Sequence, residues 1–260
     1  LPLIRCYGKL KEALKEGLIS EETINTSVRR VLKTKFVLGL FENPYVNPKG
    51  ISKLFDTKKN RDLARKAGRE SLILLKNADN ILPLKKNISS IAIIGPSANS
   101  TRNLYADYNY TSHHSYNKNV PESVKMVTIL EGVKNKVGNK VKINYAKGCE
   151  INDNDKSGFS EAVFVANQSD VIIAVVGERS GLFGTGWSGE GCDRTNMKFL
   201  GVQEELLKEL CATGKPVIVV LINGRPITCP WMAENFNAII EAWFPGEEGG
   251  NAIADVIFGD

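Results

Sequence analysis

Val171-Ile172-Ile173-Ala174-Val175-Val176 is a short, unbroken apolar run. Such a run is typical of a β-strand that is buried on both faces of a parallel sheet. It ends at Gly177 and continues into a glycine-rich loop to Arg194, which carries acids, arginines and two aromatic residues. An amphipathic helix is expected over 202–211. This order predicts an open α/β sheet with the loop at the carboxyl end of a central strand, where such sheets bind ligands.

The same alternation of apolar runs and helical segments extends to both sides of this stretch. Strands alternating with helices predict a mostly parallel sheet covered by helices on both faces, which is a three-layer α/β sandwich. Right-handed crossovers place all strand-to-helix loops on one rim of the sheet, namely the loops that begin at Gly95, Gly177, Gly224 and Gly246. The segment 71–76 fits either a helix or a strand. The expected strands cover 91–94, 141–145, 171–176, 216–221 and 238–243.

The first fifty residues have a different pattern. A short helix is expected over 7–16, and Ser20 is expected to cap a longer amphipathic helix that Gly39 ends. Two helices cannot enclose a core of their own, so residues 1–42 are expected to be the end of a domain whose body lies outside this chain. Residues 43–58 are predicted to be a linker, because they contain two prolines and no periodicity. Residues 59–260 are then the sandwich domain, which is expected to be truncated at Asp260.

Composition and charge exclude several classes of protein. A net charge of +5 with scattered lysines does not indicate nucleic-acid binding. No apolar stretch approaches the roughly 18 residues of a membrane span, so no membrane partner is expected. The five cysteines match no zinc spacing, and neither a metal nor an organic cofactor is expected. The compartment stays open, with a secreted or periplasmic location favoured.

Nucleotide and serine-hydrolase motifs are also poorly matched. Gly95-Pro96-Ser97 follows a strand, but it lacks the spacing of a phosphate-binding loop, and its proline removes a backbone donor. His113 and His114 are the only histidines, and they are adjacent in a polar segment where a solvated pair is the default interpretation. The role of the surrounding segment, 105–116, stays open.

Carboxylates are the remaining catalytic candidates. Glu190 lies between Gly189 and Gly191, where backbone without Cβ atoms lets a substrate come close. An acid that alternately holds and releases a proton suits such a position. Trp187 can supply an apolar platform, and Asp193 and Arg194 can pair with each other to fix the loop. A solvated surface charge is the alternative for Glu190.

Glu178 is a competing carboxylate directly after the central strand. The neighbouring Arg179 favours a structural ion pair for it. Glu178 is therefore the weaker catalytic candidate of the two.

Several stretches together resemble glycoside hydrolase family 3, the β-glucosidase and β-xylosidase family. Residues 28–46 resemble the end of the family's barrel domain and its linker, and 74–96 resemble the opening of its second domain. The series is completed by Ser188-Gly189-Glu190-Gly191, Asp193-Arg194, Gly214-Lys215-Pro216-Val217, Asn223-Gly224-Arg225-Pro226 and Pro245-Gly246-Glu247-Glu248-Gly249-Gly250. Each match is weak by itself, and their order and spacing make them specific.

The resemblance implies a retaining, exo-acting enzyme that removes terminal β-linked glucose or xylose from an oligosaccharide or aryl glycoside. In this family a barrel domain supplies an aspartate nucleophile, and the sandwich domain supplies the general acid/base, whose position Glu190 matches. Trp187, Asp193 and Arg194 are the expected substrate contacts. No segment here resembles the nucleophile segment, so the chain is expected to be a fragment that is inactive without its N-terminal barrel. The alternatives are a doubly wound nucleotide- or flavin-binding module and a purely structural domain.

Overall fold

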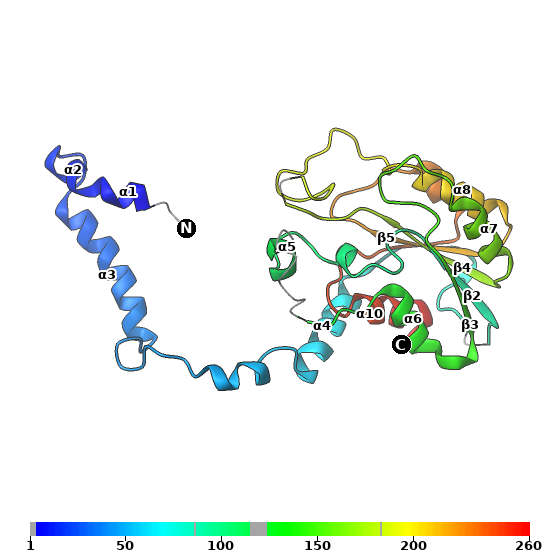
Figure 1. The fold of residues 1–260 in the computed structure, drawn as a ribbon, viewed down its shortest axis with the longest axis horizontal. Coiled ribbons are helices and arrows are strands. Elements are labelled where there is room, and N and C mark those ends of the chain that lie inside the picture. The colour runs from blue at the N-terminus through cyan, green and yellow to red at the C-terminus, as the bar shows by residue number, and fades with distance from the viewer. Residues whose placement is uncertain (1–3, 86, 115–123, 183) are drawn as a thin grey trace. The chain divides into compact units, whose positions relative to one another are not determined.

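The computed structural model describes residues 4–85, 87–114, 124–182 and 184–260. It divides the chain into two compact units, residues 1–55 and residues 56–260 (Figure 1). The first unit is helical, and the second contains the sheet.

The first unit consists of short helices and one long helix. The expected helix over 7–16 is two helices, α1 (Ile4–Gly8) and α2 (Leu10–Lys15), and a 3₁₀ helix, η1 (Pro48–Lys53), lies near the end of the unit. The long helix is α3 (Glu21–Val37), in which the Ser20 side chain accepts a hydrogen bond from the Thr23 backbone N–H at 3.1 Å. The chain turns at Gly39, whose φ is +67°, as the sequence predicts.

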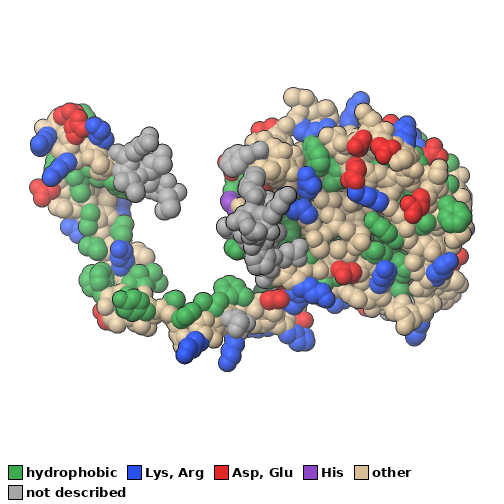
Figure 2. Space-filling model, in the orientation of Figure 1, with side chains coloured by type: hydrophobic (Ala, Val, Ile, Leu, Met, Phe, Trp, Pro, Cys, Tyr) green, Lys and Arg blue, Asp and Glu red, His purple; other side chains and the backbone are tan. Residues whose placement is uncertain are grey.

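The described residues of the first unit cover the apolar stripe of α3 only in part: Ile24 is half-buried, and the ring of Phe41 lies 4.4 Å from that of Phe36. No residue of α3 is buried, and Val31 and Phe36 are 57% and 61% exposed. Figure 2 shows hydrophobic side chains gathered along this unit. Large exposed apolar patches on a protein are often interaction sites.

The second unit is built on a six-stranded sheet. Its strands are β1 (Ile73–Asn77), β2 (Ser90–Ile94), β3 (Lys142–Ala146), β4 (Val171–Gly177), β5 (Val217–Ile222) and β6 (Ala238–Glu241). Their order is β1-β6-β5-β4-β2-β3, with β2 to β6 parallel and β1 antiparallel to β6. The undecided segment 71–76 is thus largely an edge strand. The predicted mostly parallel sheet is confirmed.

Helices cover both faces of the sheet, as expected for a sandwich (Figure 1). One apolar cluster joins alternate residues of β2, β4, β5 and β6 to α6 (Ile129–Val137) and α10 (Gly249–Phe258), and α4 (Lys58–Ser71) packs on α10. The other cluster joins the opposite residues to α7 (Phe159–Asn167), α8 (Gln203–Ala212) and α9 (Pro230–Asn235). The central strands are fully buried for this reason, and they read as unbroken apolar runs. The remaining elements are η2 (Ala78–Asn80), η3 (Arg102–Leu104), α5 (Tyr110–His114) and η4 (Gly138–Lys140).

The strand-to-helix loops lie on one rim, as predicted. Because β2, β4, β5 and β6 are parallel, their carboxyl ends reach the same edge of the sheet. From β2 the chain goes outward to β3, and it then returns to place β4 on the other side of β2. The loops after β2 and β4 diverge at this reversal of strand order, which is the position where open α/β sheets form a ligand crevice.

A buried carboxylate connects the helices of one face. Asp255 on α10 is 1% exposed. It accepts two hydrogen bonds of 2.6 Å from Arg65 on α4 and one of 2.5 Å from Lys136 on α6. Burial alone would raise the pKa of Asp255, but the hydrogen bonds from Arg65 and Lys136 outweigh it and lower the pKa below its ordinary value. The ionised form therefore stabilises the folded state.

We expect acid to weaken the second unit partly through Asp255. A carboxyl whose pKa is depressed in the folded state contributes stability above its unfolded pKa of about 3.9, and loses it as the pH falls through the folded value. Asp255→Asn should lower the free energy of unfolding at pH 7 by about 2–3 kcal/mol and flatten its decline below pH 4. Urea unfolding between pH 3 and pH 7 measures both effects. Asp153→Asn, at an exposed acid, is the control, and equal acid sensitivity of the parent and Asp255→Asn would contradict the assignment.

Candidate active site

The loop after β4 begins at Gly177, which packs closely against β5 and forms hydrogen bonds with the side chain of Gln203. Gly177 has a φ of +135°, and a Cβ there would lie 2.0 Å from the carbonyl oxygen of Ile222 on β5. Only glycine tolerates that approach. The buried side chain of Gln203 accepts a hydrogen bond from Gly177 N–H and donates one to the Gly177 carbonyl, both at 2.8 Å. The loop therefore begins in one fixed direction.

The loop then folds back on itself. Trp187 N–H donates to the carbonyl of Arg179, and Gly181 N–H donates to the carbonyl of Ser188, both at 2.9 Å. A Cβ on Gly181 would lie 2.2 Å from the backbone nitrogen of Gly186. The glycines of this loop therefore allow close packing of backbone on backbone.

Glu190 follows this fold as an accessible carboxylate. It is exposed, and it lies between Gly189 and Gly191, whose φ values are +114° and +68°. Its backbone N–H donates to Oδ2 of Asp107 at 2.9 Å, and the hydroxyl of Tyr108 donates to its carboxylate oxygen Oε2. The loop after β4 thus presents Glu190 at the rim where the carboxyl ends of the parallel strands lie, and the sequence did not indicate its contacts with Asp107 and Tyr108.

The predicted substrate contacts take different positions. Trp187 is half-buried, and the guanidinium carbon of Arg179 lies 5.0 Å from the centroid of its ring. Asp193 is exposed. Arg194, which was expected to pair with Asp193, has its guanidinium 3.6 Å from Oε1 of Glu178 and donates to Oδ1 of Asn196 at 3.0 Å. Trp187 and Asp193 are thus at least partly open to solvent on this loop, whereas Arg194 is directed toward the buried Glu178.

Glu178 belongs to a buried ion-pair cluster. Its side chain is 0% exposed, and Arg225 donates to both of its carboxylate oxygens, from Nε to Oε2 at 3.1 Å and from Nη2 to Oε1. Burial raises the pKa of Glu178, and the charges of Arg225 and Arg194 oppose that rise. The structural ion pair suggested for Glu178 therefore exists, but its partners are Arg225 and Arg194 in place of Arg179. A fully buried acid with this pairing cannot reach a substrate.

A polar hollow lies at the crevice between the β2 and β4 loops. Its volume is about 520 Å³, and Trp187 and Arg179 form part of its wall. The rest of the wall includes Asn99 and Asn103 after β2, and Lys147 and Glu150 after β3. Of the predicted site residues, Trp187 lines this hollow, whereas Glu190, Asp193 and Arg194 are not part of its wall.

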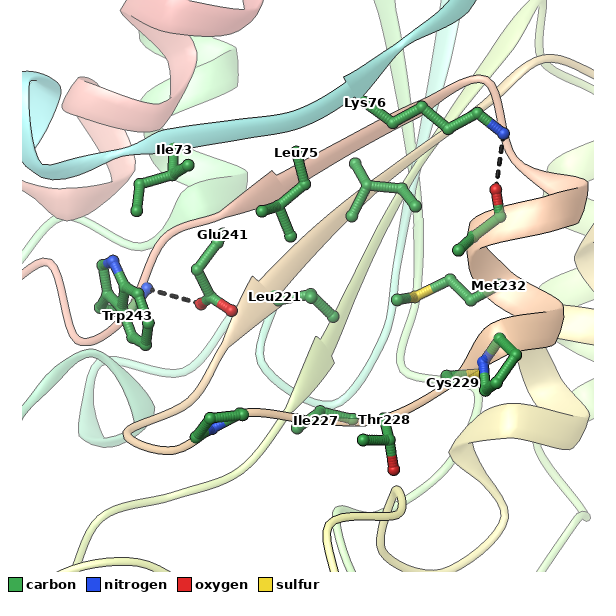
Figure 3. A pocket seen from close by; sticks show the side chains of 14 residues that line it. Ile73, Leu75, Lys76, Leu221, Ile227, Thr228, Cys229, Met232, Glu241 and Trp243 are labelled. Carbon is green, nitrogen blue, oxygen red and sulfur yellow. Dashed lines mark hydrogen bonds between the residues drawn. The ribbon is translucent and has the colours of Figure 1, made fainter.

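A second pocket lies beside the edge strand β1, with a volume of about 550 Å³ and mostly apolar walls. Figure 3 shows the Glu241 side chain in this pocket, directed toward the main chain of Trp243. Glu241 is 5% exposed. Its carboxylate accepts hydrogen bonds from Trp243 N–H and from the Asn223 side chain, both at 3.1 Å. Burial raises the pKa of Glu241. Its two oxygens already connect the ends of β5 and β6, so Glu241 does not compete with Glu190.

The described residues contain neither a metal-binding cluster nor a membrane-spanning helix. Within 4–85, 87–114, 124–182 and 184–260, no group of three or more His, Cys, Asp or Glu residues is arranged to hold a metal ion. None of the helices in the described part of the chain is both long and apolar enough to cross a membrane. Of the two histidines, His113 is exposed, and the side chain of His114 and residues 115–116 of the segment 105–116 lie outside the described residues.

Comparison with known proteins gives a consistent result. The model of the glycosyl hydrolase family 3 C-terminal domain matches residues 72–260. A beta-xylosidase of Formosa agariphila is 40% identical over 255 residues, which is 96% of this chain and 34% of the relative. A periplasmic beta-glucosidase of Salmonella typhimurium is 37% identical and spans 98% of this chain and 35% of its own length.

Solved structures agree with these sequence matches. A β-glucosidase from intestinal bacteria that takes part in saponin metabolism superposes with a TM-score of 0.86 at 29% identity, over 97% of this chain and 38% of that one. A β-glucosidase from Erythrobacter marinus gives a TM-score of 0.79 at 31% identity, over 97% of this chain and 35% of that one. The chain thus spans about a third of the length of the relatives that it matches. On the domain match and these identities, the chain belongs to glycoside hydrolase family 3, and residues 72–260 are its C-terminal domain.

Proposed function

We propose that this chain carries the acid/base half of the active site of a retaining, exo-acting β-glycosidase. The reaction removes a terminal β-linked glucose or xylose from an oligosaccharide or an aryl glycoside, without a metal or organic cofactor. Glu190 first protonates the departing glycosidic oxygen, and it later takes a proton from the water that releases the sugar. The observation that carries the proposal is the exposure of Glu190 between two glycines, on the loop that follows the carboxyl end of β4.

The retaining mechanism needs a second carboxylate as nucleophile. In retaining glycosidases the two carboxyl groups lie about 5–5.5 Å apart, and the nucleophile forms a covalent glycosyl-enzyme. The resemblance assigns that nucleophile to an aspartate of a barrel domain. Because the matched relatives are about three times as long as this chain, we propose that a longer protein supplies it.

The first unit supports the same arrangement. The exposed stripe of α3, with Val31 and Phe36, is suited to packing on the rest of a barrel. We propose that residues 1–42 are the last helices of that barrel, that 43–58 link the domains, and that the sandwich continues past Asp260.

The residues around Glu190 are the proposed substrate contacts, and the loop after β2 argues against the rival function of nucleotide or flavin binding. Trp187, Asp193 and Arg194 are proposed to contact the substrate, with part of the Arg194 guanidinium already engaged by Glu178. The names of the matched relatives indicate glucosides and xylosides as substrates. A nucleotide- or flavin-binding module is disfavoured, because the loop after β2 lacks the glycine fingerprint and the family is that of a glycosidase.

The test compares the 260-residue chain with a longer protein that contains it. The longer protein should release the β-anomer first from 4-nitrophenyl β-glucoside or β-xyloside, as seen by ¹H NMR before mutarotation. The chain alone should give no measurable turnover, because an acid without its nucleophile leaves the covalent step undone.

Two outcomes of this comparison would contradict the proposal. Initial formation of the α-anomer would exclude a retaining mechanism. Turnover by the 260-residue chain alone would show that the missing carboxylate lies within it. Heat-treated chain at the same concentration is the control for spontaneous hydrolysis.

A further inference from the structure

We propose that Tyr108 is a positioning residue for Glu190, and that Asp107 holds the backbone at the same point. This inference rests on the proposed function of Glu190 as acid/base. The tyrosine hydroxyl holds one carboxylate oxygen, so that the other is presented to the leaving group. Neither residue belongs to the loop that carries Glu190, because they precede it by 82 and 83 positions in the chain.

Asp107 fixes the backbone on which Glu190 stands. Its Oδ2 accepts the Glu190 N–H at 2.9 Å. A Cβ at the preceding residue, Gly189, would lie 2.9 Å from the same oxygen and 2.4 Å from the carbonyl oxygen of Gly181. Any side chain at position 189 would therefore push the Glu190 loop away from Asp107. The glycine before the acid is thus explained by a contact as well as by substrate access.

Asp107 and Tyr108 stand on a turn that is held by its own side chains. Asn109 accepts a hydrogen bond from the Ser112 N–H at 2.9 Å, and the Ser112 hydroxyl donates to the carbonyl of Ala106 at 2.8 Å. Ser112 is 2% exposed. Upstream, the fully buried Leu104 packs in the apolar cluster, and its carbonyl accepts the Gly246 N–H at 3.0 Å. The segment that carries the Tyr108 hydroxyl is therefore connected to the core through Leu104, a few residues upstream.

The geometry leaves one oxygen of Glu190 for chemistry. Tyr108 donates to Oε2, and no other described residue forms a hydrogen bond or ion pair with Oε1. A general acid needs one oxygen to carry the transferred proton, while a donor on the other oxygen limits rotation of the carboxyl group. In the first step the proton passes from Oε1 to the glycosidic oxygen as the C–O bond breaks. Tyr108 keeps its own proton throughout.

The titration of Tyr108 is consistent with a permanent donor. The hydrogen bond to Glu190 is the largest cause that raises the pKa of the Tyr108 phenol, and the nearby charge of Asp107 acts in the same direction. The ring of His113 packs beside it, with its centroid 5.8 Å away. A tyrosine with a raised pKa stays protonated at neutral pH, so it can donate to Glu190 whenever the carboxylate is ionised.

The contact itself can be tested in the 260-residue chain without any catalysis. Tyrosine labelled with ¹³C at Cζ reports each phenol by NMR, and Tyr108→Phe identifies the resonance of Tyr108 among the seven tyrosines. Glu190→Gln should bring the pKa of Tyr108 down toward its ordinary value, because the ionised acceptor is lost. Glu209→Gln, at an exposed glutamate of α8, should leave it unchanged. An identical Tyr108 titration in the parent chain and Glu190→Gln would overturn the proposal.

The positioning role is tested in the longer protein. Tyr108→Phe should lower kcat/KM for glycosides with poor leaving groups about tenfold, the effect of one hydrogen bond to a charged group. For 2,4-dinitrophenyl glycosides, kcat/KM should stay within about twofold of the parent value, since 2,4-dinitrophenolate departs with little need for protonation. Asp107→Ala should show the same pattern. Tyr45→Phe, at a tyrosine of the first unit that is 86% exposed, is the control. It should leave kcat/KM unchanged for both kinds of substrate.

The outcomes separate this inference from the proposed function. Loss of poor-leaving-group activity in Glu190→Ala, with no such loss in Tyr108→Phe, would overturn the positioning role and leave the acid/base role in place. Equal slowing of both substrates by Tyr108→Phe, at an unchanged melting temperature, would also overturn it. A Glu190→Ala variant without leaving-group dependence would instead remove the proposed function.

Discussion

Replacement of Glu190 by alanine in the longer protein is expected to slow hydrolysis of glycosides with poor leaving groups by about 10²–10⁴-fold, which is the contribution of one positioned acid. The reason is that an alkoxide or simple phenoxide leaves slowly unless it is protonated as the bond breaks. A 2,4-dinitrophenolate leaves without that help, so formation of the glycosyl-enzyme from its glycoside should be slowed far less. A plot of log(kcat/KM) against the leaving-group pKa measures the difference, and it should become steeper in the variant.

Matched variants make this result specific to position 190. Glu209→Ala removes an exposed glutamate from α8 on one covered face of the sheet, and it should leave the plot unchanged. In Glu190→Ala, added azide should restore turnover of the activated substrate by attacking the glycosyl-enzyme and giving a β-glycosyl azide. Equal slowing for good and poor leaving groups would show that Glu190 is a solvated charge or a purely structural residue.

The layers of the fold could be predicted because a strand that is buried on both faces consists of consecutive apolar residues, which are visible in the local sequence. β2, β4 and β5 are unbroken apolar runs, since helices cover both of their faces. The edge strand β1 does not have this pattern of burial. Its residues Ile73 and Leu75 are 46% and 56% exposed, and its antiparallel partner β6 is more than 160 positions further along the chain. A local pattern cannot decide between helix and strand for a segment whose conformation depends on a distant partner.

The site could be predicted only as far as its own loop. Glycines at 189 and 191 and the strand before them place Glu190 on the rim. The contacts of Glu190 with Asp107 and Tyr108 join segments that no sequence period relates. The same limit explains the pairing of Glu178. Arg179 is its neighbour in sequence, but residues next to each other at the end of a strand point in opposite directions. The partner is Arg225, in the loop that follows β5.

The second large effect is expected from Arg225. Arg225→Ala should lower the free energy of unfolding of the 260-residue chain by about 3–5 kcal/mol, because it leaves the fully buried carboxylate of Glu178 without its main partner. Arg194, 3.6 Å away, offsets part of that loss. The same change removes the hydrogen bond of 3.0 Å from Arg225 to the Asn196 carbonyl, so the segment after Glu190 also loses an anchor. Urea unfolding at pH 7 measures the loss.

The pH dependence of this loss shows whether the buried charge causes it. Burial raises the pKa of Glu178, and without Arg225 the neutral acid is the form that the folded protein tolerates. An acid with a raised folded pKa contributes its stability below its unfolded value of about 4.3 and loses it as the pH rises through the folded value. The destabilisation by Arg225→Ala should therefore be small near pH 4 and complete at pH 7. Adding Glu178→Gln should recover part of it at pH 7, and a loss that is the same at both pH values would contradict a buried-charge origin.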